Sequence, residues 1–143
     1  MSRGLLVFAP CGTGKSHFIK RFKGHNSNPI VDGDTLLEEA GVYNRNYLWY
    51  EDYPKERAKI IRAIEKALKK GIHVFYSGNP LLWEPDYIVY PDPEVRKRQL
   101  RCRDEYVPTT IQFDREEEAY QTAIEEGIPS FGSFEELEPY LGS

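Results

Sequence analysis

The stretch FAPCGTGKS, residues 8–16, is the most informative part of this sequence. It follows the apolar run Leu5 to Phe8, which is typical of a short strand buried on both faces. The residues after it, His17 to Phe22, can form a helix. The chain is therefore expected to leave a buried strand through small, turn-forming residues and to place a lysine and a serine at the first step of a helix.

This strand, loop and helix predict a binding site for the phosphates of a nucleoside triphosphate. Gly12, Thr13 and Gly14 let the backbone curl, so that successive amides converge on one point beside the helix N-terminus. Lys15 is expected to reach the β and γ phosphates, and Ser16 is expected to bind Mg²⁺. The spacing is that of a Walker A motif with alanine in place of its first glycine. The expected nucleotide-binding residues are Cys11, Gly12, Thr13, Gly14, Lys15, Ser16 and His17.

Length and composition indicate one intracellular domain over residues 1–143. A 40% hydrophobic content with 13% aromatic residues is ample for one packed core. The net charge of −4 gives no general attraction to polyanions, so a phosphate-rich ligand needs a local basic cluster. The two cysteines form neither a disulfide framework nor a zinc-binding spacing. No apolar run approaches the ~18 residues of a membrane span, so we expect a cytoplasmic protein with no membrane association and no obligate protein partner.

Short apolar runs alternate with helical patterns along the chain. Further strands are predicted at 30–31, 72–76, 87–90 and 128–131. Helices are predicted at 35–40, at 54–70, from 92 to about 103, and after two capping boxes that begin at Thr109 and Ser133. Because parallel neighbours need crossover connections, this alternation predicts a three-layer α/β/α fold with a five-stranded parallel sheet.

Two carboxylates follow the second predicted strand. Ligands of open α/β sheets bind outside the carboxyl ends of the strands, so Asp32 and Asp34 are expected to face the γ-phosphate and its acceptor. On an extended segment, side chains two residues apart point the same way, and Gly33 leaves room between them. Alternatively, Asp34 is the N-cap of the helix that follows. The third predicted strand runs into Ser77-Gly78-Asn79-Pro80 without a carboxylate, which argues against motor ATPases.

The phosphate loop, the paired aspartates and the basic segment before the last strand together resemble the small P-loop kinases. Their order is similar to that in gluconate kinase and adenylylsulfate kinase, and Tyr106-Val107-Pro108 is similar to polynucleotide kinase. The resemblance spans nearly the full chain. It implies a P-loop NTPase fold with a short lid at approximately 96–110, and ATP and Mg²⁺ as cofactors. It also implies that Asp32 assists Mg²⁺ binding and that Asp34 is the base on the acceptor.

The expected lid carries five basic residues, which are Arg96, Lys97, Arg98, Arg101 and Arg103. In the kinases that the chain resembles, this segment closes over the triphosphate, and an arginine there can supply roughly 10³–10⁵ in rate. Because Val95 and Leu100 are expected to turn inward, we predict that Arg98 and Arg101 contact ATP, with Arg103 as an alternative. A solvated basic helix is the other interpretation. The expected catalytic residues are Lys15, Asp34, Arg98 and Arg101.

Aromatic residues concentrated at 43–50 form a candidate acceptor pocket. Arg45, Tyr47 and Trp49 could stack a base and pair with a phosphate, although packing of this loop against the sheet is the alternative. Asp34 and Asn79 complete the expected acceptor-binding set, with a plain turn as the alternative for Asn79.

The nature of the acceptor follows from the predicted base. A hydroxyl acceptor benefits from a positioned carboxylate, whereas an acceptor phosphate needs little deprotonation. We therefore expect transfer of the γ-phosphoryl group to a hydroxyl of a nucleoside, nucleotide or polynucleotide. The alternatives are a nucleoside monophosphate kinase, a small-metabolite kinase and a non-catalytic nucleotide-binding regulatory protein.

Overall fold

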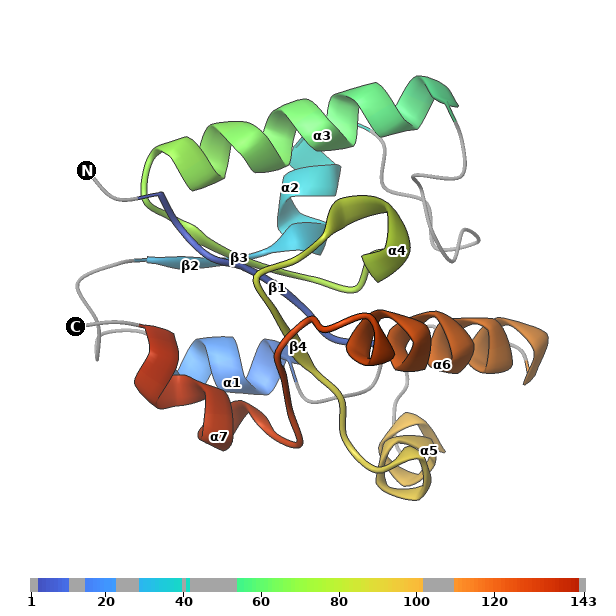
Figure 1. The fold of residues 1–143 in the computed structure, drawn as a ribbon. Coiled ribbons are helices and arrows are strands. Elements are labelled where there is room, and N and C mark those ends of the chain that lie inside the picture. The colour runs from blue at the N-terminus through green and yellow to red at the C-terminus, as the bar shows by residue number, and fades with distance from the viewer. Residues whose placement is uncertain are drawn as a thin grey trace.

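A computed structural model describes residues 3–10, 15–22, 29–39, 41, 54–101 and 110–141. These residues form a parallel sheet of five strands, β1 (Leu6–Phe8), β2 (Ile30–Asp32), β3 (His73–Tyr76), β4 (Tyr87–Val89) and β5 (Ser130–Phe131). The helices are α1 (Lys15–Phe22), α2 (Gly33–Glu39), α3 (Pro54–Lys69), α4 (Pro80–Trp83), α5 (Pro93–Arg101), α6 (Thr110–Glu125) and α7 (Phe134–Leu137), with a final 3-10 turn, η2 (Glu138–Leu141). Figure 1 shows the arrangement, which confirms the expected α/β fold.

The strands lie in the order β2-β3-β1-β4-β5, and every neighbouring pair is parallel. The chain fills the sheet on one side of β1 first, and then crosses β1 between β3 and β4. Such a change of direction creates a crevice at the carboxyl ends of the strands, where ligands of open α/β sheets bind. The end of β1 that leads into the predicted phosphate loop lies at this edge, beside the end of β3.

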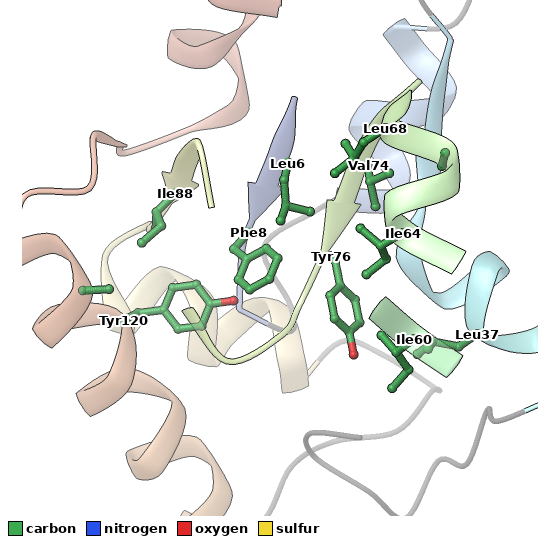
Figure 2. Packing of buried hydrophobic residues seen from close by; sticks show 12 residues of the cluster. Leu6, Phe8, Leu37, Ile60, Ile64, Leu68, Val74, Tyr76, Ile88 and Tyr120 are labelled. Atoms are coloured by element: carbon green, nitrogen blue, oxygen red, sulfur yellow. The ribbon is translucent and has the colours of Figure 1, made fainter. Parts of the chain in front are cut away.

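Alternate residues of the central strands feed two separate cores, because successive side chains of a strand point to opposite faces. On one face, Leu6 and Phe8 of β1 join residues from β3, β4, α2, α3 and α6, as Figure 2 shows. From α3, Ile60 and Ile64 are buried in this core. Ile61, which neighbours them in sequence, is 41% exposed.

The opposite face of the sheet is covered by α1 and α7 (Figure 1). Phe18 of α1, Phe75 of β3 and Phe134 of α7 stack with ring centroids 5.1 to 5.8 Å apart. This aromatic stack fixes the helix that begins at Lys15 against the sheet. Both cores therefore hold the carboxyl edge in place from either side.

A buried histidine ties β1 and β3 to the last turn of the described chain. The Leu5 amide donates to Nδ1 of His73 at 2.9 Å, so Nε2 carries the proton and donates to the Leu141 carbonyl at 3.1 Å. Burial lowers the pKa of His73, so its neutral form is the stable one.

The last predicted strand forms despite its proline. The backbone of Pro129 cannot donate a hydrogen bond, but its carbonyl accepts from the Ile88 amide at 2.9 Å. The Tyr90 amide donates to the Phe131 carbonyl at 2.8 Å. At the following helix, Ser133 is the N-cap and accepts from the Glu136 amide at 3.3 Å, as expected. Among the residues that the structure describes, no helix is both long and apolar enough to cross a membrane.

Candidate functional site

Three polar side chains from three elements meet at the carboxyl edge of the sheet. Lys15, the first residue of α1, places Nζ 3.3 Å from Oδ1 of Asp32, the last residue of β2. The same Nζ donates to Oγ of Ser77, the residue after β3, also at 3.3 Å. The Lys15 and Asp32 side chains are 10% and 19% exposed. The structure thus brings the predicted phosphate lysine and the predicted metal-binding acid together, and it adds Ser77, to which no role was predicted.

The turn from β2 into α2 sets the position of Asp32. Its Oδ1 accepts from the Asp34 amide at 3.0 Å and so satisfies a free amide at the start of the helix. Gly33 is buried beneath Tyr76, where an added Cβ would lie 2.6 Å from the ring carbon Cδ1. Glycine is therefore needed here for a close approach between β2 and β3, and the Tyr76 ring occupies the space of the missing side chain.

Asp34 lies in the first turn of α2 and is half-buried. The predicted start of the helix at Thr35 is wrong, because the helix begins at Gly33. The alternative, in which Asp34 is the N-cap, is wrong as well, because the acid that caps the helix is Asp32. The two carboxylates consequently do not lie on one extended segment. The physical reason is that the small Gly33 permits the helix to start directly after the strand. That Asp34 acts as a base stays a prediction.

The segment after β3 is held by hydrogen bonds to its neighbours. Tyr120 of α6 donates to the Gly78 carbonyl at 3.0 Å. The side-chain Oδ1 of Asn79 accepts from the Leu81 amide at 3.0 Å, which makes Asn79 the N-cap of α4. Asparagine followed by proline is a typical helix start, and this signal could have predicted α4. Acceptor binding by Asn79 stays a prediction beside this capping role.

The root of the expected lid is anchored by a buried ionic cluster. Arg96 of α5 has no exposed surface, pairs with Glu116 of α6, and places Nη1 2.8 Å from Oε1 of Glu117. Its guanidinium carbon lies 4.2 Å from the centroid of the Phe113 ring. The hydroxyl of Tyr90 donates to Glu117, and burial together with this bond raises the pKa of Tyr90 to about 12.

The prediction that Val95 and Leu100 turn inward from α5 missed its most buried side chain, and the side chain of Leu100 is not among those described. Arg96 is the fully buried side chain, whereas Val95 is only half-buried. The buried partners of Arg96 come from α6, some twenty residues further along the chain. The basic run by itself therefore does not indicate this contact. Arg98 is exposed. Its predicted contact with ATP stays a prediction.

Several predicted site residues lie outside the described part of the chain. These are Cys11, Gly12, Thr13, Gly14, Arg45, Tyr47, Trp49 and Arg103. The helix positions of Ser16, His17 and Arg101 are described, but their side chains are not.

The described residues at the edge supply one of the expected metal ligands, Asp32. Across the described ranges, no three His, Cys, Asp or Glu side chains gather into a group that could hold a metal ion. Magnesium at phosphate sites usually takes one or two carboxylates and completes its shell with phosphates and water. Asp32 supplies one such carboxylate beside the expected phosphate site, so the donor set fits Mg²⁺ that arrives with a nucleotide.

A cavity of about 500 Å³ lies elsewhere, at the amino ends of the strands. It is lined by Arg3, Gly4, Leu5, Leu6, Glu65, Trp83, Glu84 and Asp86. Residues at the starts of β1 and β4 are on the opposite edge of the sheet from Lys15. This cavity is therefore not part of the candidate site.

Comparison with solved structures identifies the fold. The shikimate kinase from Bacteroides thetaiotaomicron matches with a TM-score of 0.58 and 18% sequence identity, over 85% of this chain and 77% of that chain. The chain thus has the fold of a small P-loop kinase. The finer resemblance to gluconate kinase, adenylylsulfate kinase and polynucleotide kinase stays a prediction. No protein-family model and no curated protein matches the sequence.

Proposed function

We propose that this chain is an ATP-dependent kinase that transfers the γ-phosphoryl group to a hydroxyl of a nucleoside, nucleotide or polynucleotide. The observation that carries the proposal is the 3.3 Å contact between Lys15 and Asp32 at the carboxyl edge of the sheet. It joins the lysine of the Walker A spacing to the first acid of the Asp-Gly-Asp sequence. Phosphoryl transfer depends mainly on positioning and on neutralisation of charge, and this pair provides groups for both.

Lys15 and the loop before it form the nucleotide side of the proposed site. The amides of residues 11–16 and the amino end of α1 hold the phosphates, and Lys15 donates to the β and γ oxygens. A triphosphate carries more negative charge than one carboxylate, so it competes with Asp32 for the ammonium group. Asp32 and Ser16 would hold Mg²⁺, which would neutralise part of the phosphate charge.

Asp34 and the basic segment form the reacting side. Asp34 orients the acceptor hydroxyl and takes its proton, a role worth roughly 10²–10⁴ in rate. Arg98 and Arg101, on the helix rooted by Arg96, neutralise charge on the transferring group. Arg45, Tyr47, Trp49 and Asn79 hold the acceptor.

A direct experiment identifies the class of acceptor. ATP labelled at the γ position is incubated with nucleosides, nucleotides, hydroxyl-ended oligonucleotides, sugars and shikimate, the last because of the neighbouring structure. The acidic balance of the chain makes a small acceptor at least as favourable as a polymer, which would require a basic groove and show strong salt dependence. Labelled product with one class supports the proposal. Measurable ATP binding without any labelled product favours the alternative, a nucleotide-binding regulatory protein.

A substitution tests the proposed base. Asp34→Asn keeps the size of the side chain and removes its basicity, so we expect phosphoryl transfer to fall by roughly 10²-fold or more while ATP binding is retained. Transfer rate and nucleotide affinity are measured on the same preparation. An Asp34→Asn protein with full activity would exclude Asp34 as the base.

A further inference from the structure

Ser77 lies between the two halves of the candidate site. The sheet order places β3 between β1, which leads into the phosphate loop, and β2, which ends in the acidic pair. Ser77 is the first residue after β3, so it stands at the carboxyl edge between the nucleotide side and the acceptor side. A γ-phosphoryl group that moves from ATP to an acceptor must pass between these two sides.

The donor and acceptor roles of the Ser77 hydroxyl are defined by its contact with Lys15. An ammonium group can only donate, so the 3.3 Å contact makes Ser77 Oγ an acceptor from Lys15. The single proton of the hydroxyl is then left to donate to another oxygen. Because Lys15 is expected to reach the β and γ phosphates, a hydroxyl one hydrogen bond away from its Nζ is within reach of the same oxygens.

The backbone around Ser77 is fixed on both sides. The Ala9 amide donates to the Tyr76 carbonyl at 3.1 Å, which extends the pairing of β1 with β3 to the residue before Ser77. Tyr120 holds the Gly78 carbonyl, and Asn79 caps α4. The hydroxyl is therefore held in place before any ligand arrives, which is the condition under which a donor contributes most to stabilising developing charge.

We infer that Ser77 is a ligand-binding residue of this site, whose hydroxyl accepts from Lys15 and donates to an oxygen of the γ-phosphoryl group. The inference rests on the proposed function and deepens it, because it assigns a residue to the transferring group. Ser77 lies at the end of β3, where the sequence has no carboxylate. Ser77 thereby joins the phosphate to Lys15, which in turn contacts Asp32.

The test compares two nucleotides that differ in the γ position. Affinities for Mg²⁺–ADP and for the Mg²⁺ complex of β,γ-imido-ATP are measured by titration calorimetry on the wild type and on Ser77→Ala. A hydrogen bond to a charged oxygen predicts that Ser77→Ala weakens the imido analogue about tenfold and leaves ADP within about twofold. Ser77→Thr keeps the hydroxyl and is expected to bind both nucleotides as the wild type does.

Controls separate this role from a structural one. Ser130→Ala removes an exposed hydroxyl at the far edge of the sheet, on β5, and is expected to change neither affinity. Thermal unfolding of each variant shows whether the fold is retained, and Ser77→Cys offers a second variant of similar size that should follow Ser77→Ala. Equal weakening of both nucleotides, or no weakening of either, would overturn the assignment of Ser77. A wild-type protein that binds neither nucleotide would overturn the proposed function as well.

Discussion

The molecule contains two clusters in which a cation meets carboxylates, and they differ in burial. In the edge cluster, Lys15 and Asp32 keep 10% and 19% of their side-chain surface exposed. In the cluster between α5 and α6, Arg96 and Glu116 are fully enclosed, and Glu117 keeps 11% of its side-chain surface exposed. A partly exposed cation can exchange its carboxylate partner for a ligand, whereas a fully enclosed cation cannot be reached by a ligand. We therefore expect Lys15 to be able to exchange its partner for a ligand, and Arg96 to serve the fold.

The largest expected change in stability comes from a comparison of two variants, each of which removes the cation of one cluster. Arg96→Met leaves two buried carboxylates without their cation, so we expect the free energy of unfolding to fall by about 3–5 kcal/mol. Lys15→Met acts at the edge, where Asp32 keeps 19% of its side-chain surface exposed, so we expect a smaller loss of stability together with loss of nucleotide binding. Urea denaturation of both variants measures the difference.

The exposed neighbour of Arg96 is the matched control for this pair. Arg98→Met removes the same charge from the same helix at an exposed position and should change stability by no more than about 0.5 kcal/mol. If Arg96→Met were as stable as Arg98→Met, the cluster between α5 and α6 would not be what stabilises the fold.

A substitution at Gly33, with an expected effect of intermediate size, tests whether the turn after β2 positions Asp32. Gly33→Ala would place a Cβ 2.6 Å from the Tyr76 ring and 2.8 Å from its Cβ, so either the ring or the start of α2 must shift. We expect a loss of about 1–3 kcal/mol in the free energy of unfolding. Because Asp32 precedes this glycine, nucleotide affinity should fall as well, as measured by titration.

Another glycine provides the comparison for that variant. Gly4 also lacks space for a Cβ, which would lie 1.9 Å from the Ile72 carbonyl oxygen, but it is at the amino ends of the strands. Gly4→Ala should therefore reduce stability without a specific effect on nucleotide affinity in the remaining folded protein. Equal affinity in folded Gly33→Ala and wild type would show that the turn does not control Asp32.

The smallest expected effect concerns a buried group that is neutral. Because burial lowers the pKa of His73 below its ordinary value of 6.5, the unfolded chain takes up the proton first. The contribution of His73 to stability is therefore complete well above that value and declines as the pH falls through and below it. Urea denaturation across this range measures the slope, and His73→Phe should flatten it. An unchanged slope would show that His73 does not control the acid response.

The fold was largely predictable because its signals are local. The apolar runs at Leu5 to Phe8 and at 72–76 identify buried strands, and the Walker A spacing predicts the helix that begins at Lys15. Burial of Arg96 could not be predicted in the same way, because its partners lie on another helix. The start of α2 was misjudged because the close approach of Gly33 to Tyr76 depends on the pairing of β2 with β3. Approach of Asp32 to Lys15 was predictable from topology, whereas the contact of Lys15 with Ser77 required the register.

The aromatic stack behind α1 has a consequence for how the site is assembled. Phe134 reaches Phe18 and Phe75 from almost the far end of the described chain. During synthesis, the helix that begins at Lys15 therefore leaves the ribosome long before its second aromatic partner does. Until that partner is available, α7 does not cover this face of the sheet, and the helix has only one of its two aromatic contacts.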